Sequence, residues 1–310
     1  MQEAEGKLFE ISQRNVKKDV TQINPVIKEA MVMLEKAANQ KEGLSGLRTG
    51  FEGLDKMTSG WQNSDLIIIA ARPAMGKTAF VLSMARNMAV KHHQAVAIFS
   101  LEMSAVQLVN RLIASETELS AEKLKTGRLT DEEWQQLHSR IKALVEAPIL
   151  VDDTPALSIF ELRAKCRRLK QKYGIKVLII DYLQLMTAAA PGKSGDNRVT
   201  VVSDISRALK IMAKELNVPV ICLSQLSRAN ESRTDKRPML SDLRESGAIE
   251  QDADSVMFLY RDEYYNPNTQ DKNIAECIVA KNRHGETGTV KLQWRPQFFT
   301  FSDLEWKHEG

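Results

Sequence analysis

The chain has 310 residues, 43% of them apolar and 27% charged, a composition typical of a folded globular protein and not of a disordered one. Its 43 basic and 40 acidic residues leave a formal net charge of +3, so any contact with nucleic acid must come from local basic loops. Three cysteines without metal-ligand spacing are expected as reduced core residues, and the lack of a bilayer-length apolar run or an N-terminal leader favours a cytoplasmic protein without membrane contact.

Residues 1–46 are polar and rich in Lys and Glu, and they contain one predicted helix at about residues 25–40. Apolar residues recur there at helical spacing and form one face: Ile27, Ala30, Met31, Leu34 and Ala38. A lone helix cannot bury such a face, so we expect it to dock on its own domain or, as the favoured alternative, on another chain. We therefore divide the sequence into a linker with a docking helix, residues 1–46, and a domain, residues 47–310.

From Leu47 onward, short apolar runs alternate with amphipathic helices. The runs predict strands at 66–70, 95–99, 149–152, 177–180 and 220–223. Two of the helices begin with capping-box spacing, Thr130 with Glu133 and Ser158 with Glu161. The alternation predicts an α/β fold with a mainly parallel twisted sheet flanked by helices. Closely spaced strands at 256–260, 274–280, 289–294 and 298–301 predict an antiparallel C-terminal extension.

Residues 71–78, Ala-Arg-Pro-Ala-Met-Gly-Lys-Thr, follow a predicted strand, precede a predicted helix and match the P-loop pattern of nucleotide-binding proteins. Backbone N–H groups would hold phosphates, with Lys77 on the outer phosphates and Thr78 in the Mg²⁺ shell. Ala71 replaces the first Gly, a mild departure because the backbone approaches phosphate most closely near Gly76. The alternative is a helix that merely starts with Gly-Lys-Thr. The residues expected to bind ATP are Arg72, Pro73, Ala74, Met75, Gly76, Lys77 and Thr78.

Polar side chains follow three other predicted strands. Asp181 ends a strand of four apolar residues, the Walker-B arrangement in which the carboxylate binds Mg²⁺ with Thr78. Glu102 lies just beyond another strand and is our predicted general base for the attacking water, and Gln225 is placed to sense the γ-phosphate. The alternatives are a strand that simply ends in Asp, a solvent-exposed Glu and a plain loop Gln.

Together with further motifs, these residues resemble the bacterial replicative DNA helicases of the DnaB family. The resemblance covers about residues 47–304, and the residues before it resemble the family's linker, whereas the family's N-terminal helical domain has no counterpart. The motifs are Arg72-Pro-Ala-Met-Gly-Lys-Thr78, Ser100-Leu-Glu-Met-Ser104, Ile180-Asp-Tyr-Leu-Gln-Leu185, Ser224-Gln-Leu-Ser-Arg228, residues 242–254 and Lys281-Asn-Arg-His-Gly285.

The resemblance implies a RecA-like P-loop ATPase core that works as a DNA helicase. It implies a hexameric ring around single-stranded DNA, ATP bound between subunits, and Mg²⁺-dependent hydrolysis that drives 5′-to-3′ translocation and unwinds duplex at the replication fork. Primase and a helicase loader are the implied partners, within the replisome at the nucleoid. Lys281 and Arg283 match the basic pair that acts on the neighbouring subunit's nucleotide, with Arg283 as the arginine finger.

The DNA-binding residues implied by the resemblance lie in two loops. Arg244, Glu245 and Gly247 match a loop that contacts the DNA backbone, and Lys193 and Arg198 belong to a second loop for which a solvated linker is nearly as good an interpretation. Basic residues also enrich the connection to the first loop, namely Arg228, Arg233, Lys236 and Arg237. Because aromatic stacking residues are lacking there, we expect the protein to follow the DNA backbone with weak sequence preference.

The P-loop by itself is also compatible with two other function classes. One is a RecA-like recombinase or scaffold ATPase that forms filaments or rings without unwinding. The other is an ATP-switch loader or adaptor that hydrolyses slowly. The strings Arg244-Glu-Ser-Gly247 and Lys281-Asn-Arg-His-Gly285 and the docking helix favour the helicase.

Overall fold

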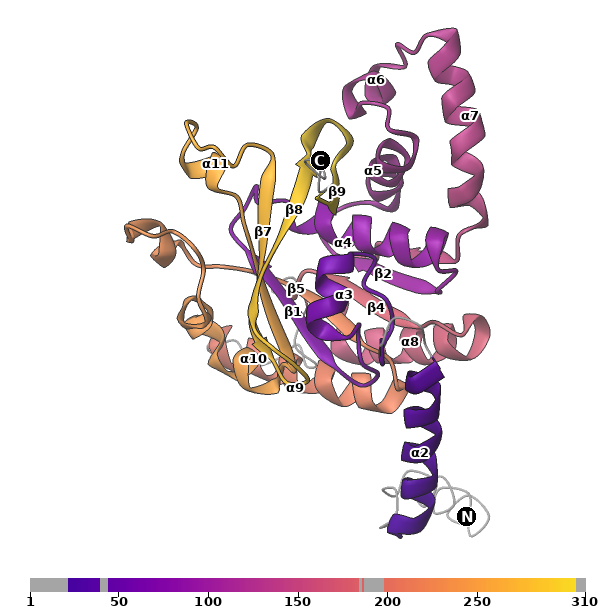
Figure 1. Ribbon diagram of the computed structural model, residues 1–310, viewed down its shortest axis with the longest axis vertical. Helices are drawn as coiled ribbons and strands as arrows, with labels where there is room; N and C mark the ends of the chain where they lie inside the picture. Colours follow the sequence, from indigo (N-terminus) through magenta and orange to yellow (C-terminus); the bar gives the residue numbers. More distant parts are fainter. Residues whose placement is uncertain (1–21, 40–43, 184–185, 187–197, 305–310) are drawn as a thin grey trace, which may run out of the picture. The chain divides into compact units, whose positions relative to one another are not determined.

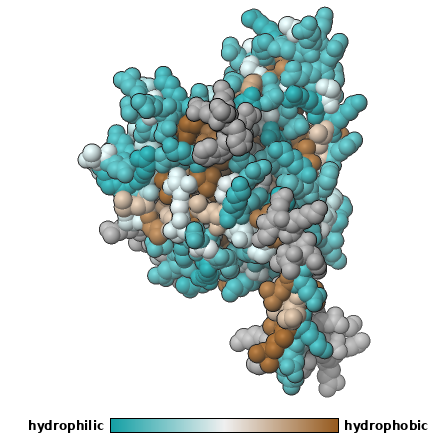
Figure 2. Space-filling model, in the orientation of Figure 1, coloured by the Kyte–Doolittle hydropathy of each residue, from teal (hydrophilic) through white to brown (hydrophobic). Residues whose placement is uncertain are grey.

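The computed structural model describes residues 22–39, 44–183, 186 and 198–304, and the chain divides into two compact units, Met1–Ser45 and Gly46–Gly310 (Figure 1). In the first unit the described element is α2 (Ile23–Asn39), a helix at the place where the sequence predicts one. Its apolar residues are exposed: Ile27 by 49%, Met31 by 52% and Leu34 by 64%. Figure 2 shows hydrophobic surface along one side of this helix and hydrophilic surface along the other.

The second unit is built on a sheet in which the described strands have the order β3-β2-β4-β5-β1-β6-β7-β8-β9. From β3 to β6 neighbouring strands pair in parallel, and β7, β8 and β9 continue the sheet in antiparallel pairing. The α/β fold with a mainly parallel sheet and an antiparallel C-terminal extension is therefore confirmed. The strands are β1 (Leu66–Ala71), β2 (Val96–Ser100), β3 (Ile149–Asp152), β4 (Val177–Asp181), β5 (Val220–Gln225), β6 (Ser255–Tyr260), β7 (Ile274–Asn282), β8 (Gly288–Arg295) and β9 (Thr300–Asp303).

The start of the antiparallel extension differs from the prediction. Strand β6 pairs in parallel with β1, from Ile67 opposite Ser255 to Ala70 opposite Phe258, so the assignment of residues 256–260 to the extension is wrong. The short helix α10 (Gly247–Asp252) leads into β6 at the same edge where β1 begins, and the strand direction reverses only at β7. Residues 298–299 are also not strand, because η5 (Pro296–Phe298) precedes β9.

Helices cover both faces of the sheet because side chains of a strand alternate in direction. On β1, Ile67 and Ile69 pack in one apolar cluster with α3 (Glu52–Thr58), α4 (Lys77–Arg86) and α5 (Ala105–Thr117). Leu66 and Ile68 pack in the other cluster, with α8 (Ile159–Tyr173), α9 (Arg198–Leu216) and α10. The remaining helical elements are η1 (Asn87–Lys91), α6 (Ala121–Thr126), α7 (Asp131–Glu146), η3 (Arg228–Ser232), η4 (Leu240–Ser246) and α11 (Asp262–Tyr265).

Local hydrogen bonds fix where the helices begin. The two predicted capping boxes are confirmed: the Thr130 and Ser158 hydroxyls each accept the N–H three residues on, and a Glu returns the bond. Ser104 forms a third such box with Gln107 at the start of α5. These caps satisfy N–H groups that a helix leaves without partners in its first turn.

The cysteines Cys166, Cys222 and Cys277 are free and buried, as predicted. Burial raises the pKa of Cys166 and that of Cys277 to about 12, and it raises the pKa of Cys222 as well. In the part of the chain that the structure describes, none of the helices combines the length and apolar character needed to span a bilayer.

We predict that a thiol-specific disulfide reagent at pH 8 modifies none of the three cysteines in the native protein, because the reactive thiolate is both buried and disfavoured. In guanidinium chloride all three should react. The release of the chromophore measures the number of modified thiols, and rapid modification of even one cysteine in the native protein would contradict this packing.

Candidate functional site

The loop between β1 and α4 has the backbone geometry of a phosphate-binding loop. Ala74 and Gly76 have positive φ angles of 66° and 96°, and α4 begins directly after Gly76. A Cβ atom on Gly76 would lie 3.0 Å from Cζ of Phe301, so both conformation and space require glycine there. Ala71, the departure from the pattern, is the last residue of β1, where it is buried and pairs with Gln225. A strand residue has no need of the conformational freedom of glycine.

Two arginines fix the position of this loop, Arg72 from within it and Arg261 from outside it. Arg72 donates from Nη1 to the Leu226 carbonyl at 2.8 Å and from Nε to the Glu231 carboxylate at 2.9 Å. Arg261 donates to the Ala74 carbonyl at 3.1 Å. Arg72 is therefore committed to protein groups and fixes the position of the loop.

Lys77, Thr78 and Asp181 form the charged centre of the site. The Thr78 hydroxyl donates to Asp181 Oδ2 at 2.8 Å, and Lys77 Nζ donates to the Ser224 carbonyl at 3.0 Å. Burial lowers the pKa of the Lys77 ammonium, an effect that Asp181 and Glu102 oppose. Burial also raises the pKa of the Asp181 carboxyl, and the hydrogen bond from Thr78 opposes that change. The site thus keeps the Lys77 cation and the Asp181 anion together although both are costly to desolvate. A cation suits phosphate binding, and a carboxylate suits metal binding.

A cavity of about 490 Å³ opens over this centre. Glu102 lies just past the end of β2 and Gln225 at the end of β5, and both side chains are exposed. Met75 is buried and is not among the residues that line the cavity. The lining residues are Arg72, Pro73, Ala74, Gly76, Lys77, Thr78, Ala79, Glu102, Arg111, Tyr182, Gln225, Trp294 and Phe299. The structure therefore brings the predicted residues of four strand ends to one place.

Sequence reasoning missed Arg111 of α5, which also lines the cavity. Burial lowers the pKa of its guanidinium, whereas the charges of Asp181 and Glu102 raise it. Its Cζ atom lies 5.1 Å from the centre of the Phe299 ring. Arg111 belongs to no motif, and the available signal was a basic residue on a helix that follows Glu102. The aromatic wall of Trp294 and Phe299 was missed because it comes from β8 and the turn before β9, far along the chain.

Lys281 and Arg283 are not brought to this cavity. Strand β7 runs antiparallel to β6, so its C-terminal end lies beside the start of β1, at the edge formed by the strand ends opposite the P-loop. Lys281 Nζ donates there to the carbonyls of Glu250 and Ala253, at 2.6 and 2.7 Å. Because β1 has six residues, the two edges are about 17–20 Å apart along the strand. Within one chain, this basic pair is too far away to touch a nucleotide at Lys77.

The predicted DNA-binding residues are located here by their backbone alone. Arg198 begins α9, Arg244 and Glu245 lie in η4, and Gly247 begins α10, while their side chains and all of Lys193 lie outside the described residues.

The basic connection before that loop is less positive than the sequence predicts. Arg233 makes two bonds to the Asp242 carboxylate, at 2.9 and 2.8 Å. Arg237 makes two to Glu276, at 2.8 and 2.7 Å. Each of these two arginines is therefore paired with a carboxylate that offsets its charge, and their contact with DNA stays a prediction.

Comparison with known proteins agrees with this geometry. The sequence profile of the DnaB-like helicase C terminal domain matches residues 46–303. The chain is 51% identical over 305 residues to the replicative DNA helicase DnaB of Geobacillus stearothermophilus, and the match covers 98% of this chain and 67% of the relative. It is 50% identical to the replicative DNA helicase DnaC of Bacillus subtilis strain 168, with the same coverage. The chain thus spans about two thirds of the length of these curated relatives.

Solved structures give the same result. One of them, described as an ATPase domain, has a TM-score of 0.86 and 42% identity, and the match covers 93% of this chain and all of that one. A DnaB-like replicative helicase, described with its interactions with primase, has a TM-score of 0.82 and 42% identity, covering 98% of this chain and 72% of that one.

We predict that Lys77→Ala lowers the affinity for ATP at least about tenfold, because it removes a half-buried ammonium from the lining of the cavity. Binding of a fluorescent ATP analogue measures the loss. Lys142→Ala, which changes an exposed lysine of α7, is the matched control and should bind ATP like the unmodified protein. Equal affinity for all three proteins would contradict the assignment of this loop.

Proposed function

Since the chain belongs to the DnaB-like helicase family and has its replicative helicase motor function, we propose that it hydrolyses ATP to move 5′-to-3′ along single-stranded DNA and unwind duplex at the replication fork. Like those relatives it is an ATP-dependent enzyme, and its membership of a helicase family sets aside the recombinase and loader alternatives. One observation carries the mechanism: the P-loop and the basic pair Lys281 and Arg283 lie at opposite edges of one sheet.

The proposed nucleotide site uses the residues that line the cavity. The N–H groups around Gly76 and the start of α4 bind the phosphates, and Lys77 exchanges its bond to the Ser224 carbonyl for the outer phosphates. Trp294 and Phe299 offer an apolar wall beside the phosphate loop. Arg111 adds positive charge next to Asp181 and Glu102, where negative charge on the transferred phosphoryl group needs compensation.

The residues present fit a magnesium ion that arrives with ATP. Thr78 Oγ1 and Asp181 Oδ2, 2.8 Å apart, are hard oxygen ligands of the kind Mg²⁺ takes alongside phosphate oxygens. Among the described residues no cluster of three or more His, Cys, Asp or Glu side chains could hold a metal by itself, in keeping with an ion held jointly with the substrate. When bound, such an ion neutralises charge on the phosphates.

Glu102 and Gln225 are assigned to act beside the outer phosphate. We assign Glu102 as the general base that orients and deprotonates the attacking water, a task its exposed carboxylate beside the loop suits. Gln225, at the end of β5 and opposite Ala71, is assigned to sense the outer phosphate. The segment after it leads through η3 to η4 and the start of α10, which carry the proposed DNA-binding residues Arg244, Glu245 and Gly247. Lys193 and Arg198 are assigned to the second DNA loop.

The catalytic site is completed by a second copy of the chain. Lys281 and Arg283, at the far edge, would reach the nucleotide of a neighbouring subunit, where Arg283 serves as the arginine finger. Repeating this head-to-tail contact closes a ring when the rotation fits, and we propose a hexamer around single-stranded DNA. A relative is described with its interactions with primase, and we propose primase and a helicase loader as partners of the whole protein.

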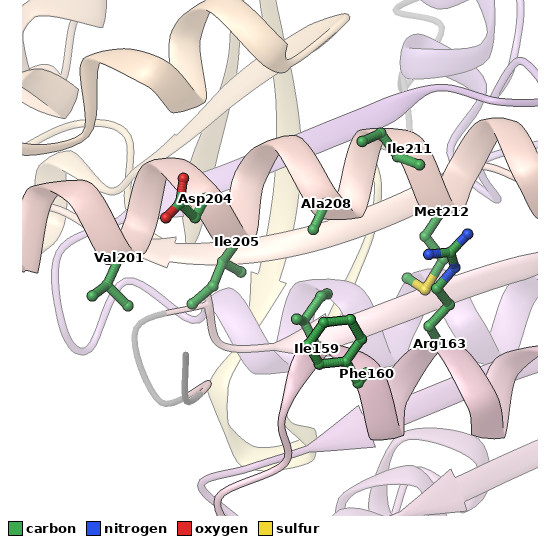
Figure 3. Close-up of a pocket in the computed structure, with 9 residues that line it drawn as sticks. All are labelled: Ile159, Phe160, Arg163, Val201, Asp204, Ile205, Ala208, Ile211 and Met212. Atoms are coloured by element: carbon green, nitrogen blue, oxygen red, sulfur yellow. The ribbon is translucent and has the colours of Figure 1, made fainter. Parts of the chain in front are cut away.

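An apolar groove between α8 and α9 offers a place for the docking helix α2 of a neighbouring copy. The groove has a cavity volume of about 250 Å³, and its lining residues are Ile159, Phe160, Arg163, Val201, Asp204, Ile205, Ala208, Ile211 and Met212 (Figure 3). Phe160 and Ile211 are 62% and 52% exposed. The apolar face of α2 supplies side chains of matching character, and burying both surfaces would be favourable.

We predict that single-stranded DNA stimulates the ATPase of the unmodified protein and that Arg283→Ala binds ATP while losing turnover by a factor of about 10³. Phosphate release and strand displacement measure both activities. In mixtures, Arg283→Ala should lower activity more steeply than its share of subunits, because each copy disables its neighbour. Activity that falls only in proportion to the unmodified content would contradict a finger acting in trans.

We also predict that Leu34→Asp lowers the molecular mass in solution, measured by light scattering with ATP and single-stranded DNA, because it places a charge on the docking face. Phe160→Asp should do the same from the groove side, and its exposed position protects the fold. Glu35→Gln, on an exposed neighbouring position of α2, is the matched control. An unchanged mass for both Leu34→Asp and Phe160→Asp would exclude this docking.

A further inference from the structure

Helix α10 lies between the proposed DNA loop and the basic pair Lys281 and Arg283, which is proposed to act on the ATP of the neighbouring subunit. Its N-terminal end continues directly from η4, the proposed DNA loop. At its C-terminal end the carbonyls of Glu250 and Ala253 accept both hydrogen bonds of Lys281 Nζ. Six helical residues extend about 9 Å, so the DNA loop and the basic pair lie at two ends of one short element.

Asp254, two residues after α10, holds Arg283 in two ways. Its carboxylate forms an ion pair with Arg283 Nη1 at 3.2 Å, and its carbonyl accepts the Arg283 backbone N–H at 2.9 Å. The carboxylate is itself fixed, because it accepts the Leu66 N–H at 2.8 Å and a bond from Lys210 Nζ. Asp254 therefore ties Arg283 to the first residue of β1 and to α9.

The burial of the two partners is unequal. The Asp254 side chain is 2% exposed, whereas the Arg283 side chain is 54% exposed. Solvent around the exposed Arg283 guanidinium screens this ion pair, so the contribution that concerns us is the fixed position it gives the arginine. The guanidinium is held without being covered, the arrangement required of a group that must meet a second subunit.

We propose that Asp254 is a positioning residue for Arg283 and that α10 transmits DNA binding at η4 to this arginine. The inference rests on the proposed function, in which η4 contacts DNA and Arg283 acts on the neighbour's ATP. DNA bound by one subunit thereby stimulates hydrolysis in the next one. A displacement of about 1 Å at a catalytic group costs up to about a hundredfold in rate, so a small shift of α10 is sufficient.

A second carboxylate at the same edge provides the matched control. Asp65 is 7% exposed and accepts from His284 Nε2 at 2.9 Å, while its distance to Lys210 Nζ is 4.0 Å. It thus resembles Asp254 in burial and in its neighbour Lys210, but its close partner is His284 and not Arg283. Asp65→Asn removes a comparable charge and leaves the anchor of Arg283 in place.

The first test compares Asp254→Asn with Asp65→Asn in the full chain, with and without single-stranded DNA. For Asp254→Asn we expect the kcat of the DNA-stimulated ATPase to fall at least about tenfold, while KM for ATP and the Kd for DNA change less than about threefold. Asp65→Asn should keep the stimulated kcat. Thermal unfolding of both proteins reports their folding. An equal loss of kcat in both variants would reduce Asp254 to a structural role and overturn the proposal.

The second test addresses α10 without touching the buried cluster. Gln251 is an exposed residue of α10, and Gln251→Gly makes the helix less stable than Gln251→Ala does, because glycine has a lower helix propensity. We expect the Gly variant to lose at least half of the stimulation by DNA at unchanged DNA affinity and the Ala variant to keep it. Equal stimulation of both variants would overturn the role of α10.

Arg283→Ala separates failure of this inference from failure of the proposed function. If Arg283→Ala keeps full turnover, the finger assignment itself is wrong. If it loses turnover while Asp254→Asn retains full stimulation, the finger stands and the positioning role of Asp254 is wrong.

Discussion

The parallel pairing of β1 with β5 and β6 determines where the polar groups of this domain lie. Because these strands and β4 run in one direction, their carboxyl ends meet at a single edge, where Asp181 of β4 and Gln225 of β5 lie beside the P-loop. Strand β7 reverses this direction and delivers Lys281 and Arg283 to the other edge. One sheet thus presents two chemically different edges, and in the proposed ring the two edges of neighbouring copies form each site.

The charged groups Lys77 and Asp181 are costly to remove from water, and bound ligands would reduce that cost. Asp181 is buried and Lys77 is half-buried, and the loss of water around them lowers the pKa of the Lys77 ammonium and raises the pKa of the Asp181 carboxyl, so that the neutral form of each group is favoured. Their mutual attraction and the Thr78 hydrogen bond oppose this effect. Phosphate beside Lys77 and a cation beside Asp181 would favour the charged forms, so that nucleotide binding offsets a cost already present in the fold.

The surface shows why counting basic residues is a poor guide to DNA contact. Arg233 and Arg237 come from a basic stretch, yet each is held by two bonds to a carboxylate on another segment. These pairs anchor the connection between β5 and η4 and offset the positive charge of both arginines. The proposed DNA contact is then made by η4 and the start of α10, and Asp254 follows the end of α10 by two residues.

The sequence by itself determined the local features: the P-loop, the polar residues at the ends of apolar strands, and the capping boxes of Thr130 and Ser158. Each depends on residues close together in the chain, so spacing is enough to predict it. Only the tertiary structure decided that β6 is parallel to β1, that Arg111 and Phe299 face the P-loop, and that Asp242 and Glu276 neutralise Arg233 and Arg237. Those contacts join segments that the sequence keeps apart, and strand order and direction bring them together.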